Sequence, residues 1–77
     1  MLSFDRLTVK AGEAIQSAAT EARRRENPEI DGAHLLHALL AQEEGIVVPV
    51  LQKLGVNVAR IREQTEAALG QLARVQG

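Results

Sequence analysis

The chain opens with a stripe of apolar and small residues at helical spacing. These residues recur at intervals of four, four, three and four: Leu7, Ala11, Ile15, Ala18 and Ala22. Such intervals place side chains along one face of an α-helix. Thr8 suits the N-cap of that helix, and Pro28 disfavours helical geometry at the residue before it. The pattern therefore predicts a first helix over residues 8–25.

A second apolar block follows, in which four leucines and three alanines surround two histidines over residues 33–41. Asp31 is positioned to cap a helix that begins at the next residue. Gly45 can take the left-handed conformation that ends many helices. We expect a helix over residues 32–42 that is buried on most sides and forms the centre of the domain.

The next stretch, "IVVPVLQKLG", is open to two interpretations. Its β-branched residues suit a strand, whereas Pro49 removes a strand hydrogen-bond donor and Gly55 supplies a helix stop. We favour a short helix over residues 47–54, with Pro49 in its first turn.

A last helix is expected over residues 58–72, with Asn57 as its N-cap. Its inward face comprises Val58, Ile61, Thr65, Ala68, Leu69 and Leu72. The four helices have short connections, and no segment of the chain repeats another. The sequence therefore predicts an all-α fold, a compact bundle of four helices in a single domain over residues 1–77.

Composition narrows the class of protein. Twelve of the 77 residues are alanine and Phe4 is the only aromatic residue, which suits helices packed closely through small side chains. Nine basic and ten acidic residues give a net charge of -1, so nothing in the charge favours nucleic acid or an anionic membrane. The absence of cysteine, of a signal peptide and of a membrane-spanning stretch leads us to expect a cytoplasmic protein.

His34 and His37 are the first candidates for chemistry. They lie three residues apart on one helix face, with Asp31 and Glu29 as potential oxygen ligands for a metal ion. A metal site would need a further ligand from another helix. We therefore interpret His34 as a structural hydrogen-bonding residue and expect no metal site.

Catalysis and nucleic-acid binding are weaker interpretations. Glu43 beside Glu44, and Glu63 three residues before Glu66, have no neighbouring nucleophile, and no glycine-rich nucleotide motif is present. The arginines at residues 23–25 suit a solvated helix end. A helix-turn-helix over residues 51–69 would present glutamates beside its arginines to DNA phosphates, which is unfavourable.

Three segments carry a resemblance to a known family. They are "FDRLTVKAGEAIQSAATEA", "IDGAHLLHALLAQEEGIVVPVLQKLGVNV" and "AALGQLARVQG". Nearly the whole chain resembles the first Clp repeat in the N-terminal domain of the AAA+ Clp chaperones, and "DRLT" with "QEEG" is most similar to the ClpB disaggregases. The resemblance implies one of two similar four-helix repeats related by pseudo-twofold symmetry. It also implies a longer chain whose ATPase modules, with their ATP, lie outside these residues, so that this chain is not an enzyme and holds no cofactor.

The function implied by the resemblance is weak binding of unfolded or aggregated polypeptide, which is then delivered to the ATPase ring. The threonine of "DRLT" is associated with that role in the family and corresponds to Thr8; beside it we place Phe4, Leu7 and Ala11 in the client-binding surface. Relatives that hold modified arginine use a glutamate where this chain has Ala33, so that activity is not transferred.

Two alternatives stay open at this stage. In the first, the chain is a structural half-domain or a stand-alone repeat, which forms a homodimer or docks an adaptor without binding clients. In the second, it is a metal protein built on His34 and His37. The partners expected under the preferred interpretation are unfolded polypeptides, the second Clp repeat and the ATPase modules.

Overall fold

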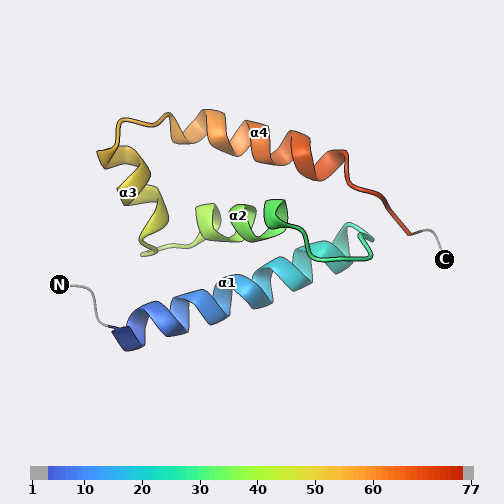
Figure 1. The fold of residues 1–77 in the computed structure, drawn as a ribbon, viewed down its shortest axis with the longest axis horizontal. Helices are drawn as coiled ribbons and strands as arrows, with labels where there is room; N and C mark the ends of the chain where they lie inside the picture. Colours follow the sequence, from blue (N-terminus) through green and yellow to red (C-terminus); the bar gives the residue numbers. More distant parts are fainter. Residues whose placement is uncertain (1–3, 76–77) are drawn as a thin grey trace.

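The computed structural model describes residues 4–75 of the chain. Those residues form four helices and no strand: α1 (Phe4–Arg24), α2 (Gly32–Ala41), α3 (Val47–Lys53) and α4 (Val58–Gly70). Figure 1 shows their arrangement. The predicted all-α fold of four helices is confirmed, and "IVVPVLQKLG" contains a helix, with Pro49 in the first turn as expected.

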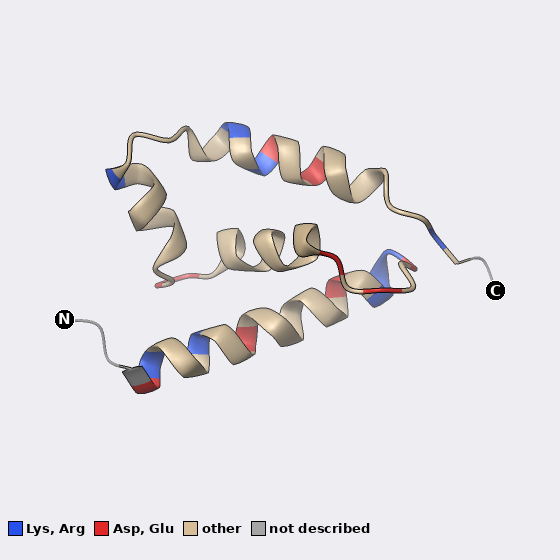
Figure 2. Cartoon of the chain, in the orientation of Figure 1, with Lys and Arg blue, Asp and Glu red and all other residues tan. Residues whose placement is uncertain are grey.

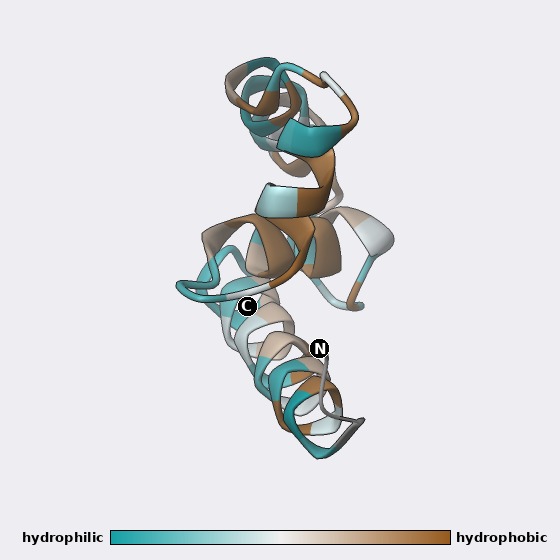
Figure 3. Ribbon diagram, turned by 90° about the vertical axis from the view of Figure 1, so that its left-hand side faces the viewer, coloured by the Kyte–Doolittle hydropathy of each residue, from teal (hydrophilic) through white to brown (hydrophobic). Residues whose placement is uncertain are grey.

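The helices are arranged as a flat stack with α2 in the middle. Both α1 and α4 pack against α2, and they do not pack against each other, while α3 joins the stack at one end by contacting α2 and α4. The Cα atoms extend over 47 × 28 × 15 Å. Seen from the α3 end, apolar residues gather on α2 and α3 in the middle of the stack (Figure 3). A stack of this thickness leaves part of every helix surface uncovered.

The core between α1 and α2 is built on small side chains. Ala14, Ala18 and Ala38 form a buried cluster against which Leu39 packs. Because alanine side chains are short, the two helix backbones approach closely there. Leu40 and Leu69 are also buried.

The expectation that α2 is buried on most sides is wrong. Leu35 and Leu36 remain 37% and 36% exposed. The physical reason is the flat arrangement, in which α1 and α4 cover only two sides of α2. On α4, Thr65 and Leu69 face inward as expected, whereas Ala68 is exposed.

The start of α1 also differs from the prediction. The helix begins at Phe4 and not at residue 8, so Thr8 lies inside it and is not its N-cap. The apolar stripe begins at Leu7, and the stripe alone gave no sign of the earlier turn. Asp5 lies in that first turn, where a carboxylate stabilises the positive pole of the helix dipole.

Left-handed backbone ends two of the helices. After α1, Glu26 has φ 60°, and the amide of Asn27 donates to the carbonyl of Ala22 at 2.9 Å. After α3, Gly55 has φ 79°; its amide donates to Gln52, and the next amide donates to Leu51, which is a Schellman motif. Gly55 therefore ends α3 as predicted.

The prediction for Gly45 is wrong. The left-handed residue after α2 is Glu44, with φ 57°, and Gly45 is not among the described glycines with positive φ. Glycine is required at position 45 for another reason, because a Cβ there would lie 2.9 Å from Cβ of Gln42. The helix itself ends at Ala41, one residue before the expected end.

The predicted N-caps of α2 and α4 are confirmed. The carboxylate of Asp31 accepts from the amide of Ala33 at 2.9 Å, and Oδ1 of Asn57 accepts from the amide of Arg60 at 3.1 Å. Each cap supplies an acceptor to a backbone N–H that has no partner within its helix. Helix α4 ends at Gly70, two residues before the expected end.

Candidate functional site

The N-terminal turns of α1 project beyond the rest of the stack. Helix α1 has 21 residues and α2 has 10, so α2 can cover only part of α1. The end of α2 is fastened to α1 at Lys10: Nε2 of Gln42 donates to the Lys10 carbonyl at 2.7 Å, and Nζ of Lys10 donates to the Glu43 carbonyl at 3.1 Å. The turn of α1 before Lys10 therefore has no helix packed on it (Figure 1).

The first half of α1 carries exposed apolar side chains. Leu7 is 36% exposed, Ile15 is 57% exposed, and Ala11 between them is also exposed. Spaced four residues apart, the three share one face of α1, and Thr8 is an exposed neighbour on the adjacent row. We call Leu7, Thr8, Ala11 and Ile15 the α1 strip. Further along the helix the same stripe is buried, at Ala18 and Ala22.

Three of the four client-binding candidates thus lie together on one helix. Leu7, Thr8 and Ala11 all belong to the α1 strip, whereas the Phe4 side chain lies outside the described residues. Ile15 was not among the candidates. Its membership of the predicted stripe was the available signal; its side chain points away from that of the neighbouring Ala14, which is buried against α2.

Charges of both signs flank the α1 strip. Arg6 pairs with Glu44 at 3.5 Å and Lys10 pairs with Glu13 at 3.9 Å. Figure 2 shows both basic and acidic residues along α1. Neither sign dominates the overhang, so a partner chain would be held there by apolar contact and not by its net charge.

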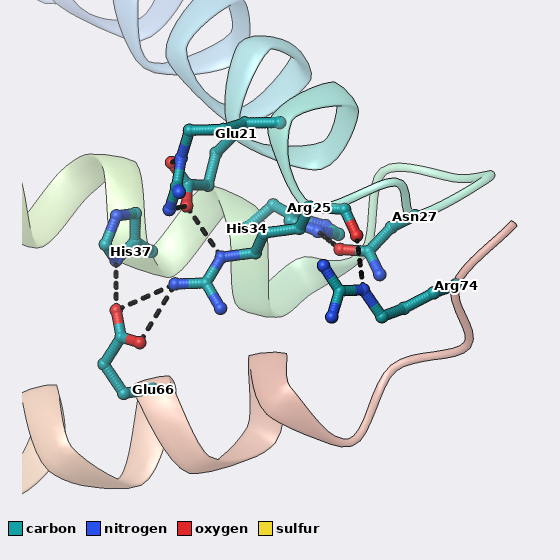
Figure 4. Close-up of polar contacts among 8 residues, drawn as sticks. Glu21, Arg25, Asn27, His34, His37, Glu66 and Arg74 are labelled. Carbon is teal, nitrogen blue, oxygen red and sulfur yellow. Dashed lines mark hydrogen bonds and ion pairs between the residues drawn. The ribbon is translucent and has the colours of Figure 1, made fainter. Parts of the chain in front are cut away.

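A polar network joins α1, α2 and α4 at the opposite end of α1 (Figure 4). Arg24 and Arg25 both donate to the carboxylate of Glu21, and Arg25 also reaches Glu66 on α4 at 2.9 Å. Nδ1 of His37 lies 3.5 Å from the same Glu66 carboxylate. The hydrogen bond from Arg24, followed by that from Arg25, lowers the pKa of Glu21 to about 2 against desolvation. Two of the three clustered arginines are thereby engaged within the fold.

His34 is fully buried, with 0% exposure, and both ring nitrogens have partners. Nδ1 accepts from the amide of Asp31 at 2.8 Å, which completes a capping box in the position that glutamate or glutamine usually occupies. The ring proton therefore sits on Nε2, which donates to Oδ1 of Asn27 at 2.8 Å. The predicted structural role of His34 is confirmed; the partner Asn27 was not predicted.

The other chemical candidates gain no support. With both nitrogens engaged, His34 cannot ligate a metal, and residues 4–75 contain no cluster of three or more histidine, cysteine, aspartate or glutamate side chains arranged to hold one. The carboxylates considered for catalysis are solvated: Glu43, Glu44, Glu63 and Glu66 are all exposed. Arg62, which a DNA-reading helix would present, instead donates to the Leu40 carbonyl at the end of α2 at 3.0 Å.

A cavity of about 370 Å³ lies between α1 and α2, on the flank of α1 that carries Lys10, Glu13 and Ser17. Its charged groups already pair with one another, since Lys10 contacts both Glu13 and the Glu43 backbone.

Among the helices of the described residues, none combines the length and apolar character needed to cross a membrane.

Comparison with known proteins places the chain in a family. Residues 6–77 match the family described as the Clp repeat (R) N-terminal domain. The sequence is 41% identical over 70 residues to the chaperone protein ClpB of Corynebacterium diphtheriae and to that of Mycobacterium tuberculosis, which covers 91% of this chain and 8% of each relative. The ClpB of Bacillus cereus is 32% identical over 76 residues, 99% of this chain and 9% of the relative.

The match fits the site described above. The chain spans less than a tenth of the length of these relatives, and the Clp repeat is a non-catalytic domain, so these 77 residues are not an enzyme. The chain is 77 residues long and folds as a four-helix stack with exposed apolar residues at the start of α1 and no phosphate-binding motif. It belongs to the Clp repeat N-terminal domain family, and within that family it is similar to the N-terminal part of ClpB chaperones.

Proposed function

We propose that this chain is a polypeptide-binding repeat, which holds unfolded or aggregated chains weakly on the α1 strip and helps deliver them to the ATPase ring of a ClpB-type chaperone. The observation that carries the proposal is the uncovered apolar face of α1 between Leu7 and Ile15. Similarity to chaperones named ClpB supports it. The second Clp repeat and the ATPase modules are the further partners of such a chain.

The size of the α1 strip argues for weak and unselective binding. Eight helical steps separate Leu7 from Ile15, about 12 Å at the rise of an α-helix. About four residues of an extended client chain cover that distance. The contact is far smaller than the roughly 1,200 Å² that stable complexes bury, so each encounter should be brief. Several copies around a ring would raise the overall affinity by avidity.

The test is an amide NMR titration of the isotope-labelled chain with a permanently unfolded polypeptide. We expect chemical-shift changes concentrated in the first three turns of α1. The substitutions Leu7→Ser and Ile15→Ser should each weaken binding several-fold, because each removes apolar area from the contact. Thr8→Ala tests the role that the family resemblance gives to this residue.

The matched control is Leu54→Ser, which removes a side chain that is 72% exposed at the C-cap of α3. This variant should bind as the original chain does. Equal loss in Leu54→Ser and Leu7→Ser, or shifts spread evenly over the chain, would contradict the proposal. So would a steep fall of affinity with salt, since the charges beside the strip are balanced.

A second candidate function is structural. Leu35 and Leu36 are exposed on α2 and Val50 is exposed on α3, a distribution that suits a face covered by another helical unit. Under this interpretation the chain forms a homodimer, or docks an adaptor, without binding clients.

Light scattering distinguishes the structural candidate. A homodimer predicts a molar mass that rises with concentration toward twice 8.3 kDa, and a Leu36→Glu variant that stays monomeric. A constant monomer mass at millimolar concentration would count against self-association. The client titration is independent of this result, because it concerns residues of α1 and not those of α2 or α3.

A further inference from the structure

The loop that follows α1 is fastened to the chain that follows α4. Three hydrogen bonds join these segments: Asn27 Nδ2 to the Ala73 carbonyl at 2.9 Å, Arg74 Nε to the Arg25 carbonyl at 3.1 Å, and the Val75 amide to the Glu26 carbonyl at 2.7 Å. We call residues 25–27 together with residues 73–75 the tail clasp. It holds residues 73–75 against the loop that follows α1 (Figure 4).

One side chain of the tail clasp is oriented by a buried histidine. Nε2 of His34 donates to Oδ1 of Asn27 at 2.8 Å, which directs the Asn27 amide nitrogen toward Ala73. On its other side the His34 ring accepts from the Asp31 amide through Nδ1. The arrangement requires a neutral ring that carries its proton on Nε2.

We propose that His34 makes the tail clasp sensitive to protons. A proton on Nδ1 would make this ring atom an N–H donor that faces the N–H of the Asp31 backbone, so that neither donor has an acceptor there. The ring or the Asp31 backbone must then move, and in either case Nε2 loses its fixed position against Asn27. Without that bond the Asn27 amide is free to rotate, which removes one of the three hydrogen bonds of the clasp and weakens its hold on residues 73–75. Histidine is the side chain that ordinarily changes charge between pH 5 and 8.

Charged groups approach His34 from several segments. Asp31 precedes α2 and its amide donates to the ring, whereas Arg25 after α1 and Arg74 in the tail are joined by the clasp. Glu21 on α1 and Glu66 on α4 are engaged by arginines.

The test follows the amide hydrogen exchange of Val75 by NMR from pH 7.5 to pH 5.5, corrected for the intrinsic chemical rate. We expect protection of this amide to fall about tenfold as the pH decreases, the effect of losing one hydrogen bond. In His34→Gln the amide oxygen can still accept from Asp31 but cannot titrate, so Val75 protection should be independent of pH. The matched control His37→Gln removes the other histidine, which is partly exposed, and should retain the pH dependence.

Constant protection of Val75 in the original chain would overturn the proposal, as would an unchanged pH dependence in His34→Gln. Nitrogen chemical shifts of the His34 ring in the original chain give a second readout that needs no substitution. Ring protonation and Val75 deprotection with one midpoint support the proposal, and two different midpoints overturn it. None of these results depends on client binding, so the proposed function stands or falls separately.

Discussion

At the scale of single residues, backbone conformation separates positions that look alike in the sequence. Glu26 and Glu44 both adopt left-handed backbone, a conformation that side chains with a Cβ occupy at a cost of about 1–2 kcal/mol. Gly55 occupies the same region without that cost. The chain therefore uses the residue best suited to this conformation at the end of α3, and unfavourable residues at the end of α1 and in the loop after α2.

This contrast gives a pair of opposite predictions. Glu26→Gly should raise the free energy of unfolding by about 0.5–1 kcal/mol, because relief of strain outweighs the greater entropy of the unfolded chain. Gly55→Ala should lower it by about 1 kcal/mol; open space surrounds a Cβ there, so the cost is conformational alone. Urea denaturation of the two variants measures both effects, and shifts of the same sign would contradict the account.

Single-residue signals were the best predicted part of the fold. Asp31, Asn57, Pro49 and Gly55 act through hydrogen bonds and dihedral angles within a few residues of themselves, and all four were assigned correctly. Gly45 was misassigned because its requirement is contact with the Gln42 side chain, which no turn rule contains.

At the scale of the helices, alanine sets how closely α1 and α2 approach. Ala14 and Ala18 are each 1% exposed and face Ala38 across the interface. The periodicity of the first stripe predicted the buried Ala18 and Ala22 correctly. It could not predict that Leu7 and Ile15, in the same stripe, stay exposed, because Leu7 lies beyond the end of α2 and Ile15 lies at the edge of the face that α2 covers. The sequence thus indicated Leu7, Thr8 and Ala11 as candidates for the site, but neither Ile15 nor the extent of the exposed surface.

The close approach makes α1 intolerant of larger side chains at its centre. Ala18→Leu should lower the free energy of unfolding by about 1–3 kcal/mol, since the added carbons have no space between the helices. Ala11→Leu adds the same carbons to the uncovered overhang and should change stability by less than about 0.5 kcal/mol. Thermal or chemical unfolding of the two variants tests this, and equal losses would show that α1 is covered along its whole length.

At the scale of the whole molecule, the polar network compensates for the absence of contact between α1 and α4. Arg25 links Glu21 on α1 to Glu66 on α4 across the edge of α2. No periodicity or local motif predicted the link between α1 and α4, because Arg25 and Glu66 are 41 residues apart in the chain. It is a product of tertiary structure that sequence patterns do not reveal.

The network makes stability depend on acid pH in a definite direction. The pKa of Glu21 falls from 4.5 to about 2 on folding, so ionised Glu21 stabilises the fold above pH 4.5, and that contribution is lost as the pH decreases toward 2. Glu21→Gln should cost about 1–2 kcal/mol at pH 7 and progressively less between pH 4.5 and pH 2. Urea denaturation across that range measures the difference.

The control for this prediction is Glu13→Gln, which removes an exposed carboxylate whose lysine partner is 3.9 Å away. It should have little effect on stability at either pH. A cost for Glu21→Gln that stays constant down to pH 2 would contradict the assigned role of the Glu21 carboxylate.

The overhang of α1 has a consequence for the motion of its first turns. Before Lys10 the helix is held by its own backbone hydrogen bonds and by surface pairs such as that of Arg6 with Glu44, without a packed partner. Isolated helical turns are marginally stable in water, so these turns should fray and re-form while Ala14 to Ala22 stay ordered. A ligand that settles on the overhang would then bind helix and suppress fraying in a single step, and part of its binding free energy would be used to order the surface that it occupies.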